Sequence, residues 1–178
     1  TTRVGQDERN VLTPDLDRNL SSPTFSDDGK TIYFRLEDEG QNHLATVDVD
    51  GENLERIIER QVNIGSFAIH GQTAVLTMGQ THQPSEVFSY RNGDLRQLTN
   101  VNESVLGNVA RADVEKLQFT SADGTPVEAF FVRPLNYQSG KRYPTILWLH
   151  CGPASQFTYN FSDTAQLYAA NGYAVIMP

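Results

Sequence analysis

The feature that most constrains the fold is a repeat of 42 residues in the first half of the chain. Three pairs of identical residues are each 42 positions apart: Phe25 and Phe67, Gly29 and Gly71, and Gly51 and Gly93. At this offset FSDDGKTIYF aligns with FAIHGQTAVL, and TVDVDGENL aligns with FSYRNGDLR, without a gap. A period of ~40–45 residues with four strands in each unit is typical of β-propeller blades. The repeat therefore predicts two blades.

Turn signals divide each repeat into short strands. Gly accepts positive φ and Asp or Asn tolerates it, so three dipeptides mark hairpin turns: Asp28-Gly29, Asp50-Gly51 and Asn92-Gly93. In the first repeat, turn signals separate four predicted strands, at 23–26, 31–35, 44–48 and 54–58. A propeller needs roughly 4–8 blades to close its ring, so further blades are expected before Thr1. Two unrelated hairpin sheets with coincident spacing are the alternative.

The pattern changes after Asn100. Residues 114–120 and 127–133 are predicted to form a hairpin around Ser121 to Gly124. The apolar residues 145–149 show no alternation, which is typical of a strand covered on both faces. A helix is predicted from 163 to about 171, followed by a strand at 173–177. Ser162 is its expected N-cap and Gly172 its C′ residue.

A strand, a helix and a second buried strand predict a right-handed parallel crossover. An antiparallel hairpin followed by this crossover is how an α/β-hydrolase sheet opens. The predicted fold class is therefore mixed, with two all-β propeller blades followed by the N-terminal part of an α/β-hydrolase domain. We expect the domains to cover residues 1–108 and 109–178, the second being incomplete.

Composition excludes several classes of partner and site. The net charge of −8 argues against nucleic acid, which requires clustered Lys and Arg, and no apolar run approaches the ~20 residues of a membrane span. The single cysteine, Cys151, excludes an internal disulfide and a cysteine-rich metal site. Asp48, Asp50 and Gly51 faintly resemble a calcium loop, but the later acidic positions are missing, so a hairpin turn is favoured. No cofactor or metal is predicted.

The strand at 145–149 leads into the turn His150-Cys151-Gly152-Pro153. Open α/β sheets bind ligands at the carboxyl ends of their parallel strands. Backbone N–H groups in such a turn can bind the negative oxygen that develops in acyl transfer. Gly152 is our candidate for this oxyanion-hole donor. A Gly-Pro turn that only redirects the chain is the alternative.

Neighbouring polar residues are weaker candidates. The catalytic His of this fold comes late in the chain, so His150 is expected to hydrogen-bond the loop backbone instead. Cys151 is not expected to act as a nucleophile, because adjacent side chains of extended chain point to opposite sides. We expect Cys151 to line the cleft and to make the intact enzyme sensitive to thiol reagents. Ser66 and Ser155 do not occupy a strained strand-to-helix turn. Three aromatic residues either line a substrate pocket or pack in the core: Phe157, Tyr159 and Phe161.

Three segments in this order resemble the prolyl oligopeptidase family of serine peptidases, most closely its acylaminoacyl-peptidase-like branch. LTPDLDRNLSSPTFSDDGKTIYF is similar to the family's late propeller blades, and LTNVNESVLGNVARADVEKLQFTSADGTPVEAFFVRP to its passage into the catalytic domain. RYPTILWLHCGP and LYAANGYAVIMP resemble the start of that domain. The family's turn reads His-Gly-Gly-Pro, so its donor maps to Gly152, while Cys151 replaces a glycine. If that position requires positive φ, Cys151 adds strain.

The resemblance implies hydrolysis of short peptides through an acyl-enzyme, with the propeller restricting access. The family's Ser, Asp and His would lie beyond Pro178, so no residue of this chain receives those roles. The implied partners are a short peptide substrate and the remainder of the chain's own polypeptide. Oligomeric state, compartment (cytoplasmic or periplasmic) and substrate specificity stay open. A TolB-like propeller that only binds, and an esterase of the α/β-hydrolase fold, are the alternatives.

Overall fold

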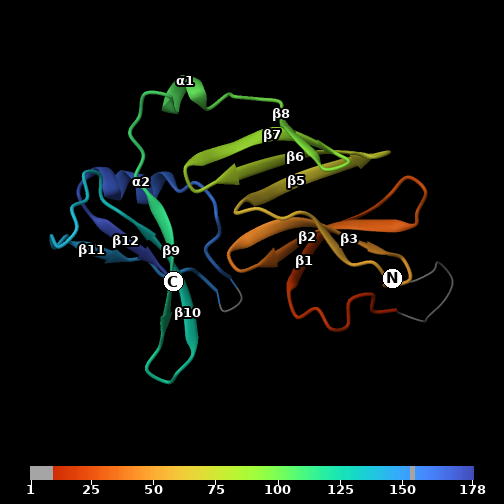
Figure 1. Ribbon diagram of the computed structural model, residues 1–178, viewed down its shortest axis with the longest axis horizontal. Helices are drawn as coiled ribbons and strands as arrows, with labels where there is room; N and C mark the ends of the chain where they lie inside the picture. The colour runs from red at the N-terminus through yellow and green to blue at the C-terminus, as the bar shows by residue number, and fades with distance from the viewer. Residues whose placement is uncertain (1–9, 153–154) are drawn as a thin grey trace. The chain divides into compact units, whose positions relative to one another are not determined.

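The computed structural model describes residues 10–152 and 155–178, which fold mainly as β-sheet (Figure 1). The chain divides into two compact units. The first comprises Thr1–Gly79 and Ser85–Asn100, and the second comprises Gln80–Pro84 and Val101–Pro178. Within the described part of the chain, no helix is long and apolar enough to cross a membrane. The domain boundary expected between residues 108 and 109 stays a prediction.

Eight strands follow one another as two sets of four. The first set is β1 (Asn19–Phe25), β2 (Thr31–Asp38), β3 (Gln41–Asp48) and β4 (Glu55–Ile58); the second is β5 (Asn63–His70), β6 (Thr73–Gln80), β7 (Gln83–Arg91) and β8 (Asp94–Gln97). Their order is β1-β2-β3-β5-β6-β7-β8, and β4 pairs with β3. Asn42 and Asn63 make the parallel pairing that joins the sets. The repeat reappears here, since β2 and β6 begin at Thr31 and Thr73.

Three strands of the first set are longer than predicted. β2 and β3 continue to a tight hairpin at Glu39 and Gly40, whose φ values are 50° and 75°. The prediction ended β2 at residue 35 and did not identify this hairpin, in which Glu39 occupies a left-handed position. β1 also begins earlier, at Asn19, and its pairing with β2 is irregular between Ser21 and Thr24. Ser22 lies in that irregularity with φ 56°.

Apolar side chains cover both faces of the first set. One face contributes to a buried cluster with the second set: Leu44, Ile58, Val62, Ile64, Ala74, Leu76 and Met78. The other face packs against Leu12 and Leu16 and contains Ile32, Phe34, Leu36, Ala45 and Val47. Polar contacts also join the sets. The Arg35 guanidinium donates to the Gly65 carbonyl at 2.7 Å, and the Asn42 amide donates to the Asn63 side chain at 2.6 Å.

A buried carboxylate ends β2. Asp38 is 8% exposed and accepts hydrogen bonds from the guanidinium groups of Arg18 and Arg56. Burial opposes ionisation of Asp38, but the two arginines outweigh it, so the pKa of this carboxyl lies below its usual value. His43 of β3 lies on the same face of the sheet as Asp38 and is 1% exposed. Neither of its ring nitrogens has a hydrogen-bond partner in the described residues.

The second unit contains a smaller mixed sheet. Its strands are β9 (Val114–Thr120), β10 (Pro126–Val132), β11 (Thr145–Leu147) and β12 (Ala174–Met177), in the order β11-β12-β10-β9. The helices are α1 (Glu103–Leu106) and α2 (Asp163–Ala170). β9 and β10 form the predicted antiparallel hairpin, and β11 pairs in parallel with β12, as expected of the crossover. The Ser162 hydroxyl accepts the Ala165 N–H at 3.2 Å and caps α2, and Gly172 follows the helix with φ 85°.

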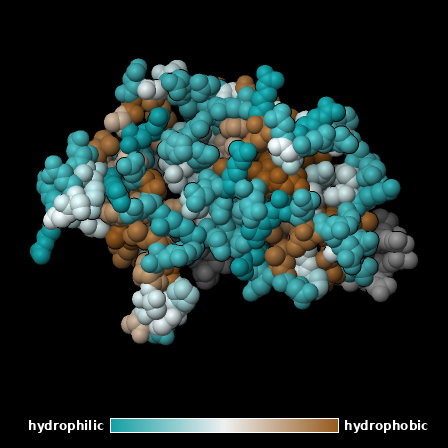
Figure 2. All heavy atoms as spheres, in the orientation of Figure 1, coloured by the Kyte–Doolittle hydropathy of each residue, from teal (hydrophilic) through white to brown (hydrophobic). Residues whose placement is uncertain are grey.

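The core of this unit lies between α2 and one face of the sheet. Phe130 of β10 meets Tyr159 edge-to-face, with ring centroids 4.9 Å apart, and small alanines of α2 let the helix approach. The prediction that the strand at 145–149 is covered on both faces is wrong. Ile146 and Trp148 pack against the core, whereas Leu147 and Leu149 are 63% and 62% exposed. The described residues therefore leave these two leucines largely uncovered, and Figure 2 shows that hydrophobic residues reach the surface of the molecule in several places.

Candidate active-site turn

The candidate oxyanion donor lies just after β11. The Trp148 N–H donates to the Ile176 carbonyl at 2.8 Å, so pairing with β12 extends one residue beyond the strand before the chain turns away. Gly152 is exposed and has φ 76°. No described residue accepts a hydrogen bond from its N–H, and a Cβ added there would meet nothing within 4 Å. Pro153, the last residue of the motif, lies outside the described residues.

The turn accommodates its departure from the family pattern. Five described residues other than glycine have positive φ, and Cys151 is not one of them. The condition under which Cys151 would add strain is not met, because the positive φ belongs to Gly152, which adopts it at no steric cost. Cys151 is also exposed, as a free thiol. The cysteine therefore changes the chemistry of the turn without left-handed strain.

Aromatic packing supports the turn from its carboxyl side. The Phe157 ring is half-buried and makes edge contacts with Trp148 and His150, at centroid distances of 5.9 Å and 6.2 Å. Sequence reasoning placed Trp148 only in a strand and missed this contact, because ring contacts across a turn leave no periodic signal. The loop-backbone hydrogen bond expected of His150 is not found in the described part of the chain. Its ring contact with Phe157 takes that place.

The remaining aromatic candidates divide between core and loop. Tyr159 is 9% exposed and belongs to the core through Phe130, so core packing is correct for this residue. Phe161 is half-buried just before α2. Of the three, Phe157 alone contacts the turn through a ring contact within the described residues.

The other polar candidates remain outside the site. Ser66 is an exposed residue of β5, and its N–H donates to the Thr77 hydroxyl at 2.9 Å; Ser155 is exposed in the loop after the turn. At the candidate calcium loop, the Gly51 N–H donates to the Asp48 carbonyl at 2.9 Å and Gly51 has φ 95°, which makes it a hairpin turn. The described residues contain no group of three or more His, Cys, Asp or Glu able to hold a metal ion.

Comparison with known proteins identifies the relatives of this chain. No family model matches it. A dipeptidyl-peptidase 5 of Porphyromonas endodontalis is 29% identical over 152 residues, which is 83% of this chain and 22% of that protein. The uncharacterized peptidase YuxL of Bacillus subtilis is 26% identical over 86% of this chain and 24% of its own length. The chain thus spans about a quarter of the length of the curated relatives it matches.

Solved structures share the fold. The acylaminoacyl peptidase of Pyrococcus horikoshii superposes with a TM-score of 0.80 at 23% identity, over 93% of this chain and 25% of that one. An acylaminoacyl peptidase in complex with Z-Gly-Gly-Phe-chloromethyl ketone gives a TM-score of 0.84 at 23% identity, over 96% of this chain and 26% of its own. The resemblance to peptidases of the prolyl oligopeptidase family is thereby borne out: dipeptidyl-peptidase 5 and peptidase YuxL are similar to this chain in sequence, and the acylaminoacyl peptidases share its fold.

Proposed function

We propose that this chain is part of a serine-type peptidase that hydrolyses short peptides through an acyl-enzyme. The observation that carries the proposal is the exposed, left-handed Gly152, which follows the carboxyl end of a strand that pairs in parallel with β12. The proteins similar to this chain in sequence carry the names of peptidases, and one protein with the same fold is in complex with Z-Gly-Gly-Phe-chloromethyl ketone. We assign the catalytic Ser, Asp and His to segments outside residues 1–178.

The role of Gly152 follows from the charge that acyl transfer creates. Attack on a peptide carbonyl places a negative charge on its oxygen, and fixed N–H donors stabilise that charge more than they stabilise the neutral substrate. Gly152 supplies one donor. The second would come from the residue after the nucleophile. Since Phe157 contacts both Trp148 and His150, the turn is supported before the substrate arrives.

The same proposal assigns the architecture. The two four-stranded sets are propeller blades within residues 1–108, and residues 109–178 open an α/β-hydrolase domain. The 42-residue repeat of the strands supports the blades. The antiparallel β9–β10 hairpin and the parallel β11–β12 pair support the hydrolase sheet. A propeller that restricts access would admit short peptides and exclude folded proteins.

The experiment starts with the reading frame that encodes this chain. It should contain a G-x-S-x-G turn ~60–80 residues after Pro178, followed by Asp and then His. The full product is then assayed on chromogenic N-acetyl-aminoacyl and dipeptidyl substrates. A serine-directed phosphonate should label the predicted Ser.

The donor itself is tested by Gly152→Ala in that product. Alanine disfavours φ 76°, so the N–H should turn away and kcat should fall about 10²-fold with little change in KM. Gly140→Ala is the matched control, because Gly140 has φ 82° and equally open surroundings but lies in another loop. Equal losses in the two variants would remove the role of Gly152. A stop codon, or a nucleophile turn without Ser, would leave a propeller-bearing binding protein instead.

A further inference from the structure

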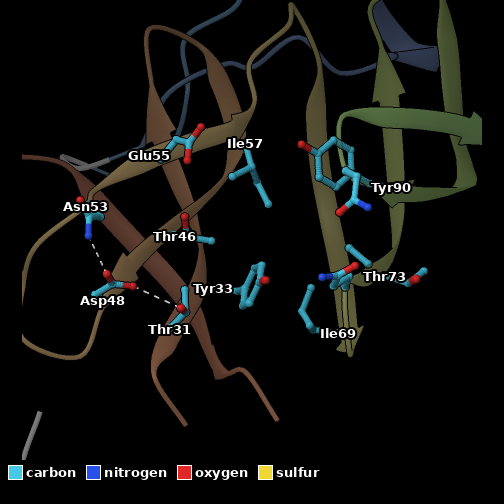
Figure 3. Close-up of a pocket in the computed structure, with 13 residues that line it drawn as sticks. Thr31, Tyr33, Thr46, Asp48, Asn53, Glu55, Ile57, Ile69, Thr73 and Tyr90 are labelled. Atoms are coloured by element: carbon cyan, nitrogen blue, oxygen red, sulfur yellow. Dashed lines mark hydrogen bonds between the residues drawn. The ribbon is translucent and has the colours of Figure 1, made fainter. Parts of the chain in front are cut away.

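The first unit contains a cavity that the proposed peptidase chemistry does not use. It has a volume of about 360 Å³ and opens between the two four-stranded sets, near the ends of β3, β5 and β7 (Figure 3). A volume of this size falls within the ~300–1,000 Å³ range of small-molecule sites. We propose that this cavity binds a small organic cation, namely a primary aliphatic ammonium such as a lysine side chain or a free alkylamine.

The charge of the lining is one-sided. Asp48 and Glu55 are its charged residues, both acidic, and no Lys, Arg or His lines the cavity. The Asp48 carboxylate is held by two neutral donors, the Thr31 hydroxyl at 3.2 Å and the Asn53 amide at 2.7 Å. These contacts fix the carboxylate and leave its charge unneutralised. A carboxylate has about four acceptor sites, so Asp48 can accept further hydrogen bonds.

Glu55 completes the negative side of the cavity. Its side chain makes no hydrogen bond or ion pair with a described residue. The guanidinium of the next residue, Arg56, is bonded to Asp38 on the other face of the sheet and does not line the cavity. An ammonium group placed here would therefore meet two carboxylates with no competing cation in the lining.

The opposite walls suit the alkyl part of such a ligand. Figure 3 shows Tyr33 and Ile57 of the first set facing Ile69 and Tyr90 of the second. Aromatic faces attract cations by ~0.5–1 kcal/mol at exposed sites, and the isoleucines offer apolar surface to a methylene chain. A ligand seated here would contact both sets of strands.

A metal ion fits the same lining less well. Calcium takes 6–8 oxygen ligands at 2.3–2.6 Å, which requires a compact shell of oxygens. Here Asp48 and Glu55 are the only carboxylates of the lining, and aromatic and aliphatic side chains form much of the wall. The lining thus favours a cation with a carbon chain.

The test titrates the isotope-labelled chain with n-butylammonium and follows its backbone amide resonances by NMR at constant ionic strength. We expect chemical-shift changes that saturate with a millimolar Kd at residues that line the cavity, such as Thr31, Asp48 and Thr73. The neutral isostere 1-butanol should leave these resonances nearly unchanged. Equal shifts with the alcohol, or shifts scattered outside the lining, would overturn the proposal.

Two variants and one control sharpen this result. Glu55→Gln removes the charge and keeps the shape of the side chain. Since Glu55 makes no hydrogen bond or ion pair with a described residue, the fold should persist while the Kd for n-butylammonium rises about fivefold. Tyr90→Leu should raise Kd about threefold. Glu103→Gln removes the same charge from an exposed position of the other unit and should leave Kd unchanged.

Calcium chloride separates the two kinds of cation. If calcium saturates the same resonances at lower concentration than the amine, and Tyr90→Leu leaves amine binding unchanged, the cavity is a metal site and the proposal fails. If calcium causes no saturable shifts while the amine does, the aliphatic ammonium assignment stands. Neither result depends on peptidase activity, so the outcome is independent of the proposed function.

Discussion

Among the described residues, the first unit contains two buried apolar clusters and the second unit contains one. In the first, apolar side chains pack on both faces of the first four-stranded set, and a buried carboxylate held by two arginines ends β2. In the second, one face packs against α2, while Leu147 and Leu149 remain exposed on β11. Because apolar burial is the main stabilising term in folding, the second unit should depend heavily on its single core.

The largest expected effect comes from that core. Phe130→Ala removes the partner of Tyr159 and should lower the free energy of unfolding by ~3–5 kcal/mol. Trp148 is the only tryptophan of the chain and packs against this core, so its fluorescence reports the second unit in a urea titration. Phe119→Ala, at a 47% exposed position of β9, is the control. Similar losses in both variants would contradict the single-core account.

The ion cluster should have the next largest effect, in the other unit. Asp38→Ala leaves Arg18 and Arg56 without their shared carboxylate. Breaking a buried pair costs ~3–5 kcal/mol, and the partial exposure of both arginines reduces this to about 2 kcal/mol. Far-UV circular dichroism should register the loss, while the Trp148 transition stays in place. The exposed Asp15→Ala is the control, and a shift of the tryptophan transition would show that the units do not unfold separately.

Acid should also distinguish the units. Burial lowers the pKa of His43, and the nearby Arg56 adds to this; the Ile58 backbone, Glu59 and Asp38 oppose the shift without cancelling it. The unfolded chain therefore binds this proton first, so the first unit loses stability as pH falls below ~6.5.

The lowered pKa of Asp38 acts in a second pH window. Its contribution to stability is present above pH ~3.9 and is lost as pH falls through the lower pKa of the folded state.

The contribution of His43 is tested by urea titrations between pH 7 and 5. They should shift the circular dichroism transition of the wild type and shift that of His43→Gln less. An unchanged slope in this variant would exclude His43. In the second unit, hydrogen bonds from Ser121 and the Thr125 backbone lower the pKa of the exposed Asp123 to about 2.

The smallest effect is expected at the turn. Cys151→Gly restores the family's glycine at a position outside the left-handed region, so stability should change by less than about 0.5 kcal/mol. The exposed thiol should react with a disulfide reagent in the folded chain about as fast as in urea. Alkylation of Cys151 is expected to inhibit the intact enzyme, and full activity after complete alkylation would refute a place for Cys151 in the cleft.

Local rules predicted most elements of both units. Gly29, Gly51 and Gly93 all adopt positive φ in hairpins, and Ser162 and Gly172 bound α2 as expected. These features depend on a few adjacent residues, so sequence carries them directly. The Glu39-Gly40 hairpin escaped because an ordinary residue occupies a left-handed position there.

Features that depend on contacts between residues far apart in the sequence were harder to predict. The exposure of Leu147 and Leu149 could not be deduced, because an apolar run looks the same whether one face or two are covered. Gly152 was found from its motif, whereas the contacts of Phe157 with Trp148 and His150 required coordinates. The Asp38 cluster joins residues 18, 38 and 56, which no local pattern relates.

The hydrogen bond from Arg35 to the Gly65 carbonyl has a consequence for local opening. The guanidinium also donates to the Ser21 hydroxyl at 3.2 Å, so one side chain connects β1 and β2 with β5. Separating the two sets would break this bond together with the Asn42–Asn63 contact. Amide protons on either side of this junction should then exchange with solvent deuterium at one common rate, as a single cooperative opening unit.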